Sequence, residues 1–334
     1  MILNSNKTLF LTILITSSLI TLSANNWLGM WMGLEMNLMS FIPLISKTKN
    51  KKSSQAMMIY FLTQSIGSIL FLFSILMNSL MFIYPKLINE FTSMLIMISI
   101  MIKVGAAPFH FWLPEMMSNL NWMECMLLMT WQKIAPLTVL SNMVLNTWLL
   151  NLLILMSVMT GSISGLNQTS LRKILAYSSI NHMGWMLAIM STNTAWYKYL
   201  TIYSMLIIMI CLLMNKKNAF FINQLVSSSP SMTEKITYTI LLLSIGGLPP
   251  FLGFLPKWMV IQSMINSNMY LLMTIMMLFS LLTLFYYLRM MMSFILSYST
   301  INKWVICKSP SKPLLFTFLS INLMLPVFTV IGFF

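Results

Sequence analysis

The sequence has no aspartate, and its 334 residues include only five acidic side chains, all of them glutamate. Charged residues make up 7% of the chain, whereas hydrophobic residues make up 58% and the mean hydropathy is +0.85. This composition excludes a water-soluble domain and indicates a polytopic membrane protein. The three cysteines, Cys125, Cys211 and Cys307, have no paired spacing, so the sequence predicts neither a disulfide framework nor a metal or iron–sulfur site.

Eleven apolar segments run along the chain, separated by polar stretches. Crossing the hydrocarbon core of a bilayer takes about 20 helical residues. The segments cover residues 8–24, 27–46, 54–78, 90–119, 122–145, 148–166, 173–191, 196–214, 236–265, 269–296 and 314–334. The sequence therefore predicts an all-α fold with about eleven transmembrane helices in one membrane domain, 1–334. The longest polar stretch, Lys216 to Lys235, is predicted to be a loop.

Basic residues are unevenly distributed between the two sides that alternating spans define. Of the 19 lysines and arginines, thirteen fall on the side of the N-terminus, two on the opposite side and four inside spans. This asymmetry is the positive-inside signature, so the net charge of +14 indicates membrane topology rather than a nucleic-acid partner. It places the N-terminus on the side of synthesis and the C-terminus opposite. The thirteen are Lys7, Lys47, Lys49, Lys51, Lys52, Arg172, Lys173, Lys216, Lys217, Lys235, Lys303, Lys308 and Lys312, and the two are Lys86 and Lys198.

Two eleven-residue stretches repeat each other, Gly105–Glu115 and Gly247–Lys257, with five identical positions. Their glycines and prolines interrupt long apolar segments, and matched interruptions in two halves of a membrane protein point to an ion path. The copies lie five spans apart, an odd number, so they run in opposite directions. The sequence predicts inverted five-helix repeats at about 8–145 and 148–296, plus an extra helix at 314–334. The residues predicted to break the helices are Gly105, Pro108, Gly247, Pro249 and Pro250.

The prolines of these two stretches also free backbone carbonyl groups. Pro108 leaves the carbonyl of Val104 without a helical donor, and Pro250 does the same for Gly246. Irregular backbone at membrane depth is tolerated only where it faces protein or water. We therefore expect the half-helix ends to face a hydrated interior beside the nearby lysines.

Four charged side chains are predicted to lie at mid-bilayer depth, where each costs about 2.5–3.5 kcal/mol on membrane-insertion scales. Glu35 lies near the middle of the second span, and Lys103, Lys133 and Lys257 lie within the fourth, fifth and ninth. Such groups must be paired, hydrated or neutral, and each condition requires a polar track through the interior. The sequence therefore predicts a proton-handling axis through these four residues.

Each of these residues also has a purely structural interpretation. Glu35 and Lys103 then form a static ion pair between helices. Lys257 extends to the membrane interface, as long basic side chains often do. Lys133 lies close to Pro136, which favours a locally hydrated kink.

The two histidines also have both a functional and a structural interpretation, and so does Arg289. His182 lies in a polar patch of the seventh span and can relay protons, because imidazole titrates near neutral pH. It can equally form a hydrogen bond between helices. His110 follows the first interruption and either joins the relay or caps exposed carbonyls. Arg289 is predicted to be an interfacial anchor.

Five segments carry a resemblance to a known family: Trp27–Pro43, Met101–Glu115, Thr130–Pro136, Ser178–Trp185 and Gly246–Trp258. They resemble the antiporter-like membrane subunits of respiratory complex I, and the resemblance covers nearly the whole chain. The length and the 37 methionines resemble a mitochondrially encoded, arthropod-like animal member. In the bacterial pattern of this family, three further helices precede the glutamate, and the sequence before Glu35 is too short to hold them. In this respect the chain resembles the shortened animal form with eleven helices.

The resemblance implies a proton-translocating membrane-arm subunit of NADH:ubiquinone reductase in the mitochondrial inner membrane. The N-terminus and basic loops would face the matrix, and the C-terminus the intermembrane space. It implies that Glu35 pairs with Lys103, that Lys133 and His182 continue the axis, and that Lys257 ends it. No cofactor is expected on this chain, which has no dinucleotide-binding motif; NADH, FMN, iron–sulfur clusters and ubiquinone are expected on other subunits. The expected partners are other membrane-arm subunits, with chains 4 and 4L as neighbours, and lipids.

Two other functions compete with this one. A stand-alone cation/proton antiporter would have the same fold class. A non-pumping scaffold would retain the buried charges for packing and assembly alone, because a static buried pair and a working one have the same sequence.

Overall fold

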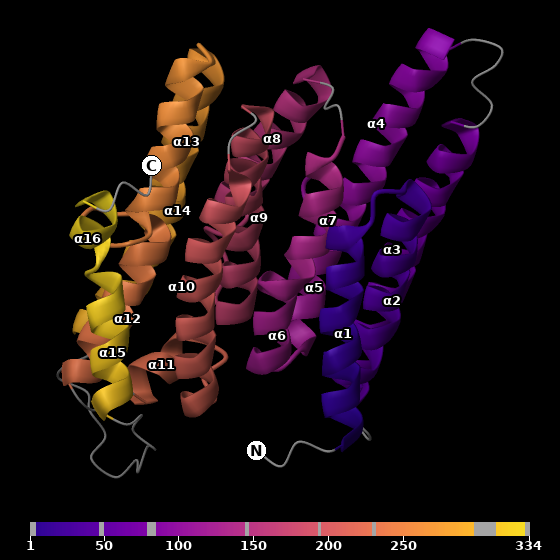
Figure 1. Cartoon of the computed structure of the whole chain (residues 1–334). Helices are drawn as coiled ribbons and strands as arrows, with labels where there is room; N and C mark the ends of the chain where they lie inside the picture. Colours follow the sequence, from indigo (N-terminus) through magenta and orange to yellow (C-terminus); the bar gives the residue numbers. More distant parts are fainter. Residues whose placement is uncertain are drawn as a thin grey trace. The chain divides into compact units, whose positions relative to one another are not determined.

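The computed structural model describes residues 5–46, 50–78, 85–143, 147–192, 195–228, 232–296 and 312–330. Within these ranges the regular structure is helical, apart from an isolated bridge between Ser170 and Phe221 (Figure 1). The all-α fold class is therefore confirmed. Outside the described ranges lie Lys47, Lys49, Lys303, Cys307, Lys308 and the last four residues of the final predicted span.

The chain divides into two compact units, Met1–Leu153 and Ile154–Phe334. The first unit contains α1 (Ser5–Ser23), α2 (Trp27–Ile45), α3 (Lys51–Asn78), α4 (Pro85–Val104), α5 (Trp112–Asn119), α6 (Trp122–Met129), α7 (Trp131–Ser141) and the start of α8 (Thr147–Ile163). Helix α3 packs against α2, α4 and α5. Helix α7 contacts α1, α2 and α4 as well as its neighbour α6, which places it inside this unit.

Two of the predicted spans in the first unit are divided helices. The span at 90–119 is interrupted between Val104 and Trp112, as the glycine and proline pattern predicts. The span at 122–145 is also interrupted, at Thr130, where φ is −110° and ψ is −72°. This second interruption was not predicted, and it precedes Lys133 by three residues. Pro136, the expected site of a kink, lies inside α7.

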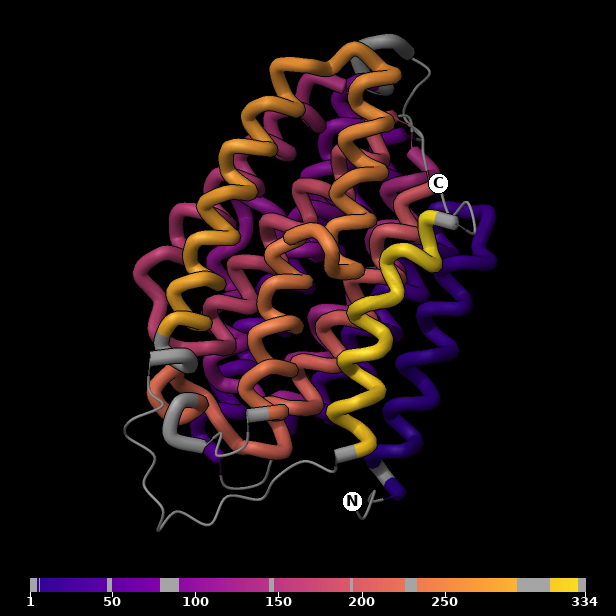
Figure 2. The backbone as a smooth tube through the Cα atoms, turned by 90° about the vertical axis from the view of Figure 1, so that its left-hand side faces the viewer, coloured from indigo at the N-terminus to yellow at the C-terminus, as the bar shows by residue number. Residues whose placement is uncertain are grey.

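Among its described residues, the second unit contains the rest of α8 and eight further helices. They are α9 (Leu171–Ser191), α10 (Trp196–Lys217), α11 (Ile222–Ser228), α12 (Met232–Gly246), α13 (Phe254–Asn266), α14 (Tyr270–Leu296), α15 (Lys312–Asn322) and α16 (Leu325–Val330). Helix α12 packs against α10, α14 and α15, and α13 packs against α9. Figure 2 shows α15, in yellow, running beside the orange α12.

Two predictions for this unit need correction. The stretch from Lys216 to Lys235 is not simply a loop, because it contains α11. Gln224, the third residue of α11, accepts hydrogen bonds from the backbone N–H groups of Phe220 and Phe221, and this N-terminal capping explains the extra helix. The last predicted span is two helices, α15 and α16, and Pro326 lies at the second position of α16, where proline is tolerated.

Helix α9 lies in the interior of the second unit. Seventeen of its 21 residues are buried, and they lie on all sides of the helix. A helix that is buried all round lies within a core rather than against solvent. This position explains how the polar patch around His182 comes to be enclosed.

One end of the second unit collects basic side chains. The N–H of Leu171 donates to the carbonyl of Phe220, which joins the start of α9 to the turn after α10. Lys217 forms a 2.5 Å ion pair with Glu234, which joins the end of α10 to the start of α12. The alternation of the predicted spans likewise places these chain segments on one side of the membrane. We call this region the basic end; its basic residues are Arg172, Lys173, Lys216, Lys217 and Lys235.

Four helical segments in the described ranges are long and apolar enough to cross a membrane: Trp27–Ile45, Lys51–Asn78, Trp196–Lys217 and Tyr270–Met292. Three shorter apolar helical segments, Lys7–Ser23, Thr147–Ile163 and Pro313–Asn322, accompany them. The broken helices α4–α5 and α12–α13 belong to neither set.

Candidate functional site

The two helix interruptions have closely similar backbone turns. Gly105 has φ of +76° and Gly247 has φ of +77°, a left-handed conformation that glycine adopts without steric cost. In each turn the next residue donates a hydrogen bond five residues back: Ala106 to Met101, and Leu248 to Leu243. The repeated sequence motifs therefore fold alike.

At the first interruption, side chains replace the missing helical donors. The amide of Gln64 donates a 3.0 Å hydrogen bond to the carbonyl of Lys103, and the indole of Trp112 donates a 3.1 Å bond to the carbonyl of Ile102. The interrupted backbone therefore faces protein, as membrane depth requires. Gln64 and Trp112 hold the end of α4, and with it Lys103, in place.

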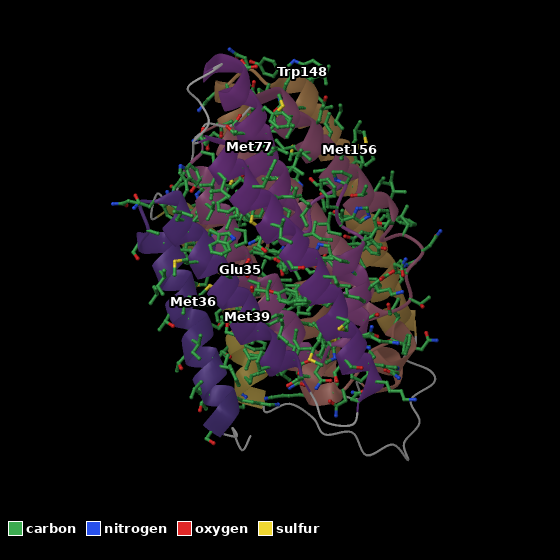
Figure 3. All side chains as sticks on the ribbon, turned by 90° about the vertical axis from the view of Figure 1, so that its right-hand side faces the viewer. Glu35, Met36, Met39, Met77, Trp148 and Met156 are labelled. Carbon is green, nitrogen blue, oxygen red and sulfur yellow. The ribbon has the colours of Figure 1, made fainter. Side chains whose placement is uncertain are left out.

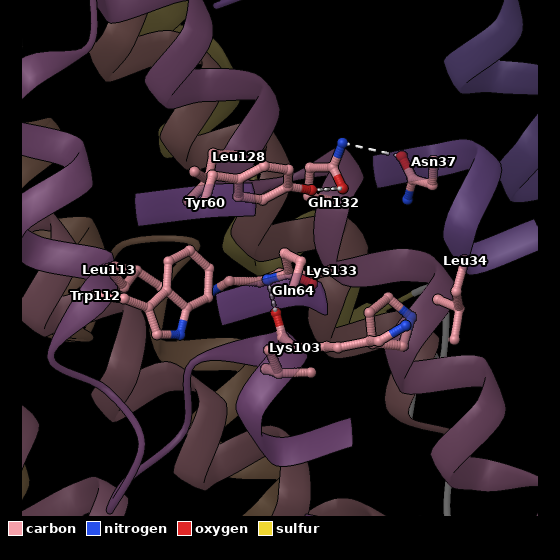
Figure 4. A pocket seen from close by; sticks show the side chains of 12 residues that line it. Leu34, Asn37, Tyr60, Gln64, Lys103, Trp112, Leu113, Leu128, Gln132 and Lys133 are labelled. Carbon is pink, nitrogen blue, oxygen red and sulfur yellow. Dashed lines mark hydrogen bonds between the residues drawn. The ribbon is translucent and has the colours of Figure 1, made fainter. Parts of the chain in front are cut away.

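Lys103 and Lys133 line the same internal cavity, although they lie on different helices, α4 and α7. Only 6% of Lys103 and 2% of Lys133 are exposed. The cavity has a volume of about 20 Å³, which is enough for one water molecule. Figure 4 shows the lining side chains from close by. The lining residues are Leu34, Asn37, Tyr60, Gln64, Lys103, Val104, Trp112, Leu113, Leu128, Gln132, Lys133 and Pro136.

A chain of hydrogen bonds crosses the wall of this cavity. The amide nitrogen of Gln132 donates to Asn37 at 3.0 Å, and its oxygen accepts from the hydroxyl of Tyr60 at 3.3 Å (Figure 4). These contacts join α7 to α2 and α3 next to Lys133. Sequence reasoning missed these residues, although Gln132 precedes Lys133 directly and Asn37 follows Glu35 by two positions.

Glu35 lies half-buried on α2, next to Met36 and near Met39, which face outward (Figure 3). Its carboxylate interacts electrostatically with Lys103. Within the described part of the chain, no contact of 4.0 Å or less joins the two charges. The predicted pair is therefore close enough to interact but is not a closed salt bridge.

Lys257 is buried and turns back toward the second interruption. Its amine donates a 2.7 Å hydrogen bond to the carbonyl of Gly246, the group that Pro250 was predicted to free. The amine also lies 5.7 Å from the ring centroid of Trp185, within reach of a cation–π interaction. The expectation of a freed carbonyl is confirmed, and Lys257 does not extend to an interface.

His182 lies in α9 of the second unit and contacts two tyrosines of α10. Its Nδ1 is 2.8 Å from the hydroxyl of Tyr199, and its ring centroid is 4.9 Å from that of Tyr203. The hydrogen bond fixes the orientation of an imidazole that is 7% exposed. The sequence contained no signal for these tyrosines, which follow His182 by 17 and 21 positions.

His110 and Arg289 both lie against backbone carbonyls. His110 Nδ1 is 3.3 Å from the carbonyl of Pro108, and its ring stacks on Phe111. Arg289 donates hydrogen bonds to the carbonyls of Leu166 and Gln168, after the end of α8. Both therefore contact backbone that has lost its helical partners.

The described residues contain no group of three or more His, Cys, Asp or Glu side chains that could hold a metal ion. Cys125 and Cys211 are buried, one in each unit.

Comparison with known proteins places the chain in a family. Residues 24–283 match the family model described as NADH:quinone oxidoreductase/Mrp antiporter, TM. The chain is 46% identical over 330 residues to NADH-ubiquinone oxidoreductase chain 2 of Anopheles gambiae, covering 95% of each sequence. The chain belongs to the NADH-ubiquinone oxidoreductase chain 2 family. A chain 2 relative from Canis lupus familiaris is 40% identical, covering 86% of this chain and 83% of that protein.

Solved structures show the same fold for this chain 2 family member. A chain of respiratory complex I from Thermus thermophilus has a TM-score of 0.85 at 19% identity, covering 97% of this chain and 78% of that one. A chain of the Mrp complex from Dietzia sp. DQ12-45-1b has a TM-score of 0.75 at 15% identity, covering 90% of this chain and 61% of that one. The antiporter-like fold is thus common to both kinds of complex.

Proposed function

We propose that this chain is a proton-translocating membrane-arm subunit of respiratory complex I in the mitochondrial inner membrane. The observation that carries the proposal is the cavity shared by Lys103 and Lys133, beside an interrupted helix and within electrostatic reach of Glu35. Two buried amines that line a cavity with room for one water molecule can exchange a proton through that water. Family membership supports the assignment to complex I.

In the proposed mechanism, redox energy released on other subunits changes the distance between Glu35 and Lys103. Moving the carboxylate away removes a stabiliser of the charged ammonium, so Lys103 releases its proton more readily. The open geometry of this pair supports such a change, because no direct contact has to be broken. The proton then passes to Lys133, and the proposed order continues with His182 and Lys257.

The proposed topology follows the sequence prediction. It has eleven transmembrane helices in one antiporter-like domain, arranged as inverted repeats at about 8–145 and 148–296 with an additional helix from 314. The matching turns at Gly105 and Gly247 support the repeat. The N-terminus and the basic loops would face the matrix, and the C-terminus the intermembrane space, because basic loops remain on the side of synthesis.

We propose that the cofactors of the reaction, NADH, FMN, iron–sulfur clusters and ubiquinone, lie on other subunits. The proposed neighbours in the membrane arm are chains 4 and 4L, together with lipids. Purification of the intact complex followed by chemical cross-linking would test the neighbours. Cross-links from this chain to chains 4 and 4L are expected, and their consistent absence would contradict the assignment.

The proposal is tested by replacing Lys257 with Met in the assembled complex and counting protons moved per NADH oxidised. We expect the ratio to fall, because the replacement keeps the apolar stem but removes the amine. Lys198→Met, a basic residue outside the proposed axis, is the matched control. An unchanged ratio for Lys257→Met in a fully assembled complex would favour the scaffold. Cation transport by the isolated chain in vesicles would favour the stand-alone antiporter.

A further inference from the structure

The second unit contains buried hydroxyl groups that the proposed axis of Glu35, lysines and His182 does not use. They belong to α9, α10 and α14, and each residue is at most 2% exposed. Hydroxyls in such apolar surroundings are normally hydrogen-bonded to protein or to ordered water. These residues are Ser178, Ser179, Tyr203, Tyr286 and Tyr287.

The five hydroxyl-bearing side chains form a series of neighbours that begins at His182. The ring of Tyr203 lies against the imidazole, at 4.9 Å between centroids, and its hydroxyl lies next to Ser179 and interacts with Tyr287. Tyr287 in turn lies next to Ser178 and Tyr286. The rings of Tyr286 and Tyr287 are 4.7 Å apart. We call these five residues the hydroxyl branch.

The hydroxyl branch leads toward the basic end of the unit. Tyr286 packs over Gly165, just after α8, where an added Cβ would lie 2.9 Å from the tyrosine ring. The same short connection leads through Gln168 into the start of α9 at Leu171. From Leu171 to His182 the helix rises about 16 Å, roughly half the thickness of the hydrocarbon core. The branch therefore leads from His182 in the direction of the basic end.

Two members of the branch are suited to hold water. The hydroxyls of Tyr286 and Tyr287 are fully enclosed, and neither makes a hydrogen bond of good distance and angle with the described residues. Their neighbours are other hydroxyls rather than aliphatic groups alone. A water molecule between them would satisfy groups that otherwise remain unpaired in an apolar core.

We propose that the hydroxyl branch conducts protons between His182 and the basic end of the second unit. A hydroxyl can accept a proton on one side and release its own on the other, so each tyrosine and serine stays neutral and no charge accumulates. This inference rests on the proposed function, because the branch would deliver protons to His182 only if His182 belongs to the proton-translocating axis. It needs ordered water beside Tyr286 and Tyr287.

The test replaces both tyrosines, Tyr286→Phe and Tyr287→Phe, in the assembled complex and counts protons moved per NADH oxidised. Only two oxygen atoms are lost, so the ring packing is retained. We expect the ratio to fall to that of the Lys257→Met complex. Tyr238→Phe is the matched control: Tyr238 is equally buried, but its hydroxyl is bonded to the carbonyl of Leu213 and lies outside the branch. Its ratio should equal that of the wild type.

The outcomes separate the two proposals. A wild-type ratio for the double variant, together with a lowered ratio for Lys257→Met, overturns the branch and leaves the proposed function standing. A wild-type ratio for Lys257→Met contradicts the proposed function itself. If the double variant does not assemble, a density map of the wild-type complex decides. Water bonded to Tyr286 and Tyr287 supports the branch, and dry packing around both hydroxyls overturns it.

Discussion

The amine of Lys257 donates a 2.7 Å hydrogen bond to the carbonyl of Gly246, eleven residues earlier in the chain. The carbonyl has no helical donor because Pro250 stands four residues later. The break and the buried lysine thus compensate each other: an otherwise unpaired oxygen binds an otherwise costly amine. Releasing this bond would free the amine for proton exchange.

Gly247→Ala should displace Lys257. A Cβ at this position would lie 2.7 to 2.9 Å from three side-chain atoms of Lys257, and the φ of +77° costs a residue with a Cβ about 1–2 kcal/mol. We expect a lower melting temperature of the complex and a lower proton-to-NADH ratio. Gly246→Ala is the control, because its Cβ would make only ordinary contacts, at 3.6 Å or more. Equal behaviour of the two variants would contradict the assigned position of Lys257.

Gln132→Leu should weaken the wall of the cavity between Lys103 and Lys133. The change leaves the buried oxygen of Asn37 and the hydroxyl of Tyr60 without their partner, which costs about 1–3 kcal/mol for each group. We expect a lower melting temperature and slower coupled NADH oxidation. Gln55→Leu, at an exposed position of α3, controls for the loss of an amide. Equal rates of NADH oxidation by the Gln132→Leu and Gln55→Leu complexes would contradict this role of Gln132.

Tyr199→Phe distinguishes a relay from a structural hydrogen bond at His182. Removing the hydroxyl eliminates the 2.8 Å contact with Nδ1, which is worth about 0.5–1.5 kcal/mol. If His182 transfers protons, the freed imidazole should reorient and the proton-to-NADH ratio should fall. If the contact only joins α9 to α10, the melting temperature falls while the ratio stays constant. Tyr238→Phe again provides the comparison.

Breaking the ion pair between Lys217 and Glu234 should destabilise the basic end. Both side chains are 1% exposed, so Glu234→Gln leaves a buried ammonium without its counter-charge, at a cost of about 3–5 kcal/mol. The double replacement Lys217→Met with Glu234→Leu should restore much of the lost stability. Thermal melting of the wild type, Lys217→Met, Glu234→Leu and the double variant measures the coupling. A double variant that melts below both single variants would rule out this role for the pair.

The sequence predicted features that depend on local rules, and it missed those that depend on distant contacts. The break at Gly105 and the freed carbonyl of Gly246 follow from glycine and proline alone. The interruption at Thr130 carries no glycine or proline, and the capping of Phe220 by Gln224 involves an ordinary glutamine. The partners of the buried lysines and of His182 depend on how helices pack, because residues such as Gln64 and Tyr199 are set by tertiary contacts.

The most direct test of the central claim is a density map of the assembled complex at a resolution that shows individual waters. The account predicts ordered water in the cavity between α4 and α7, within hydrogen-bonding distance of the amines of Lys103 and Lys133. It also predicts Lys257 turned inward to the second helix break. Lysine side chains directed to the lipid headgroups, with dry aliphatic packing in place of the cavity, would contradict it.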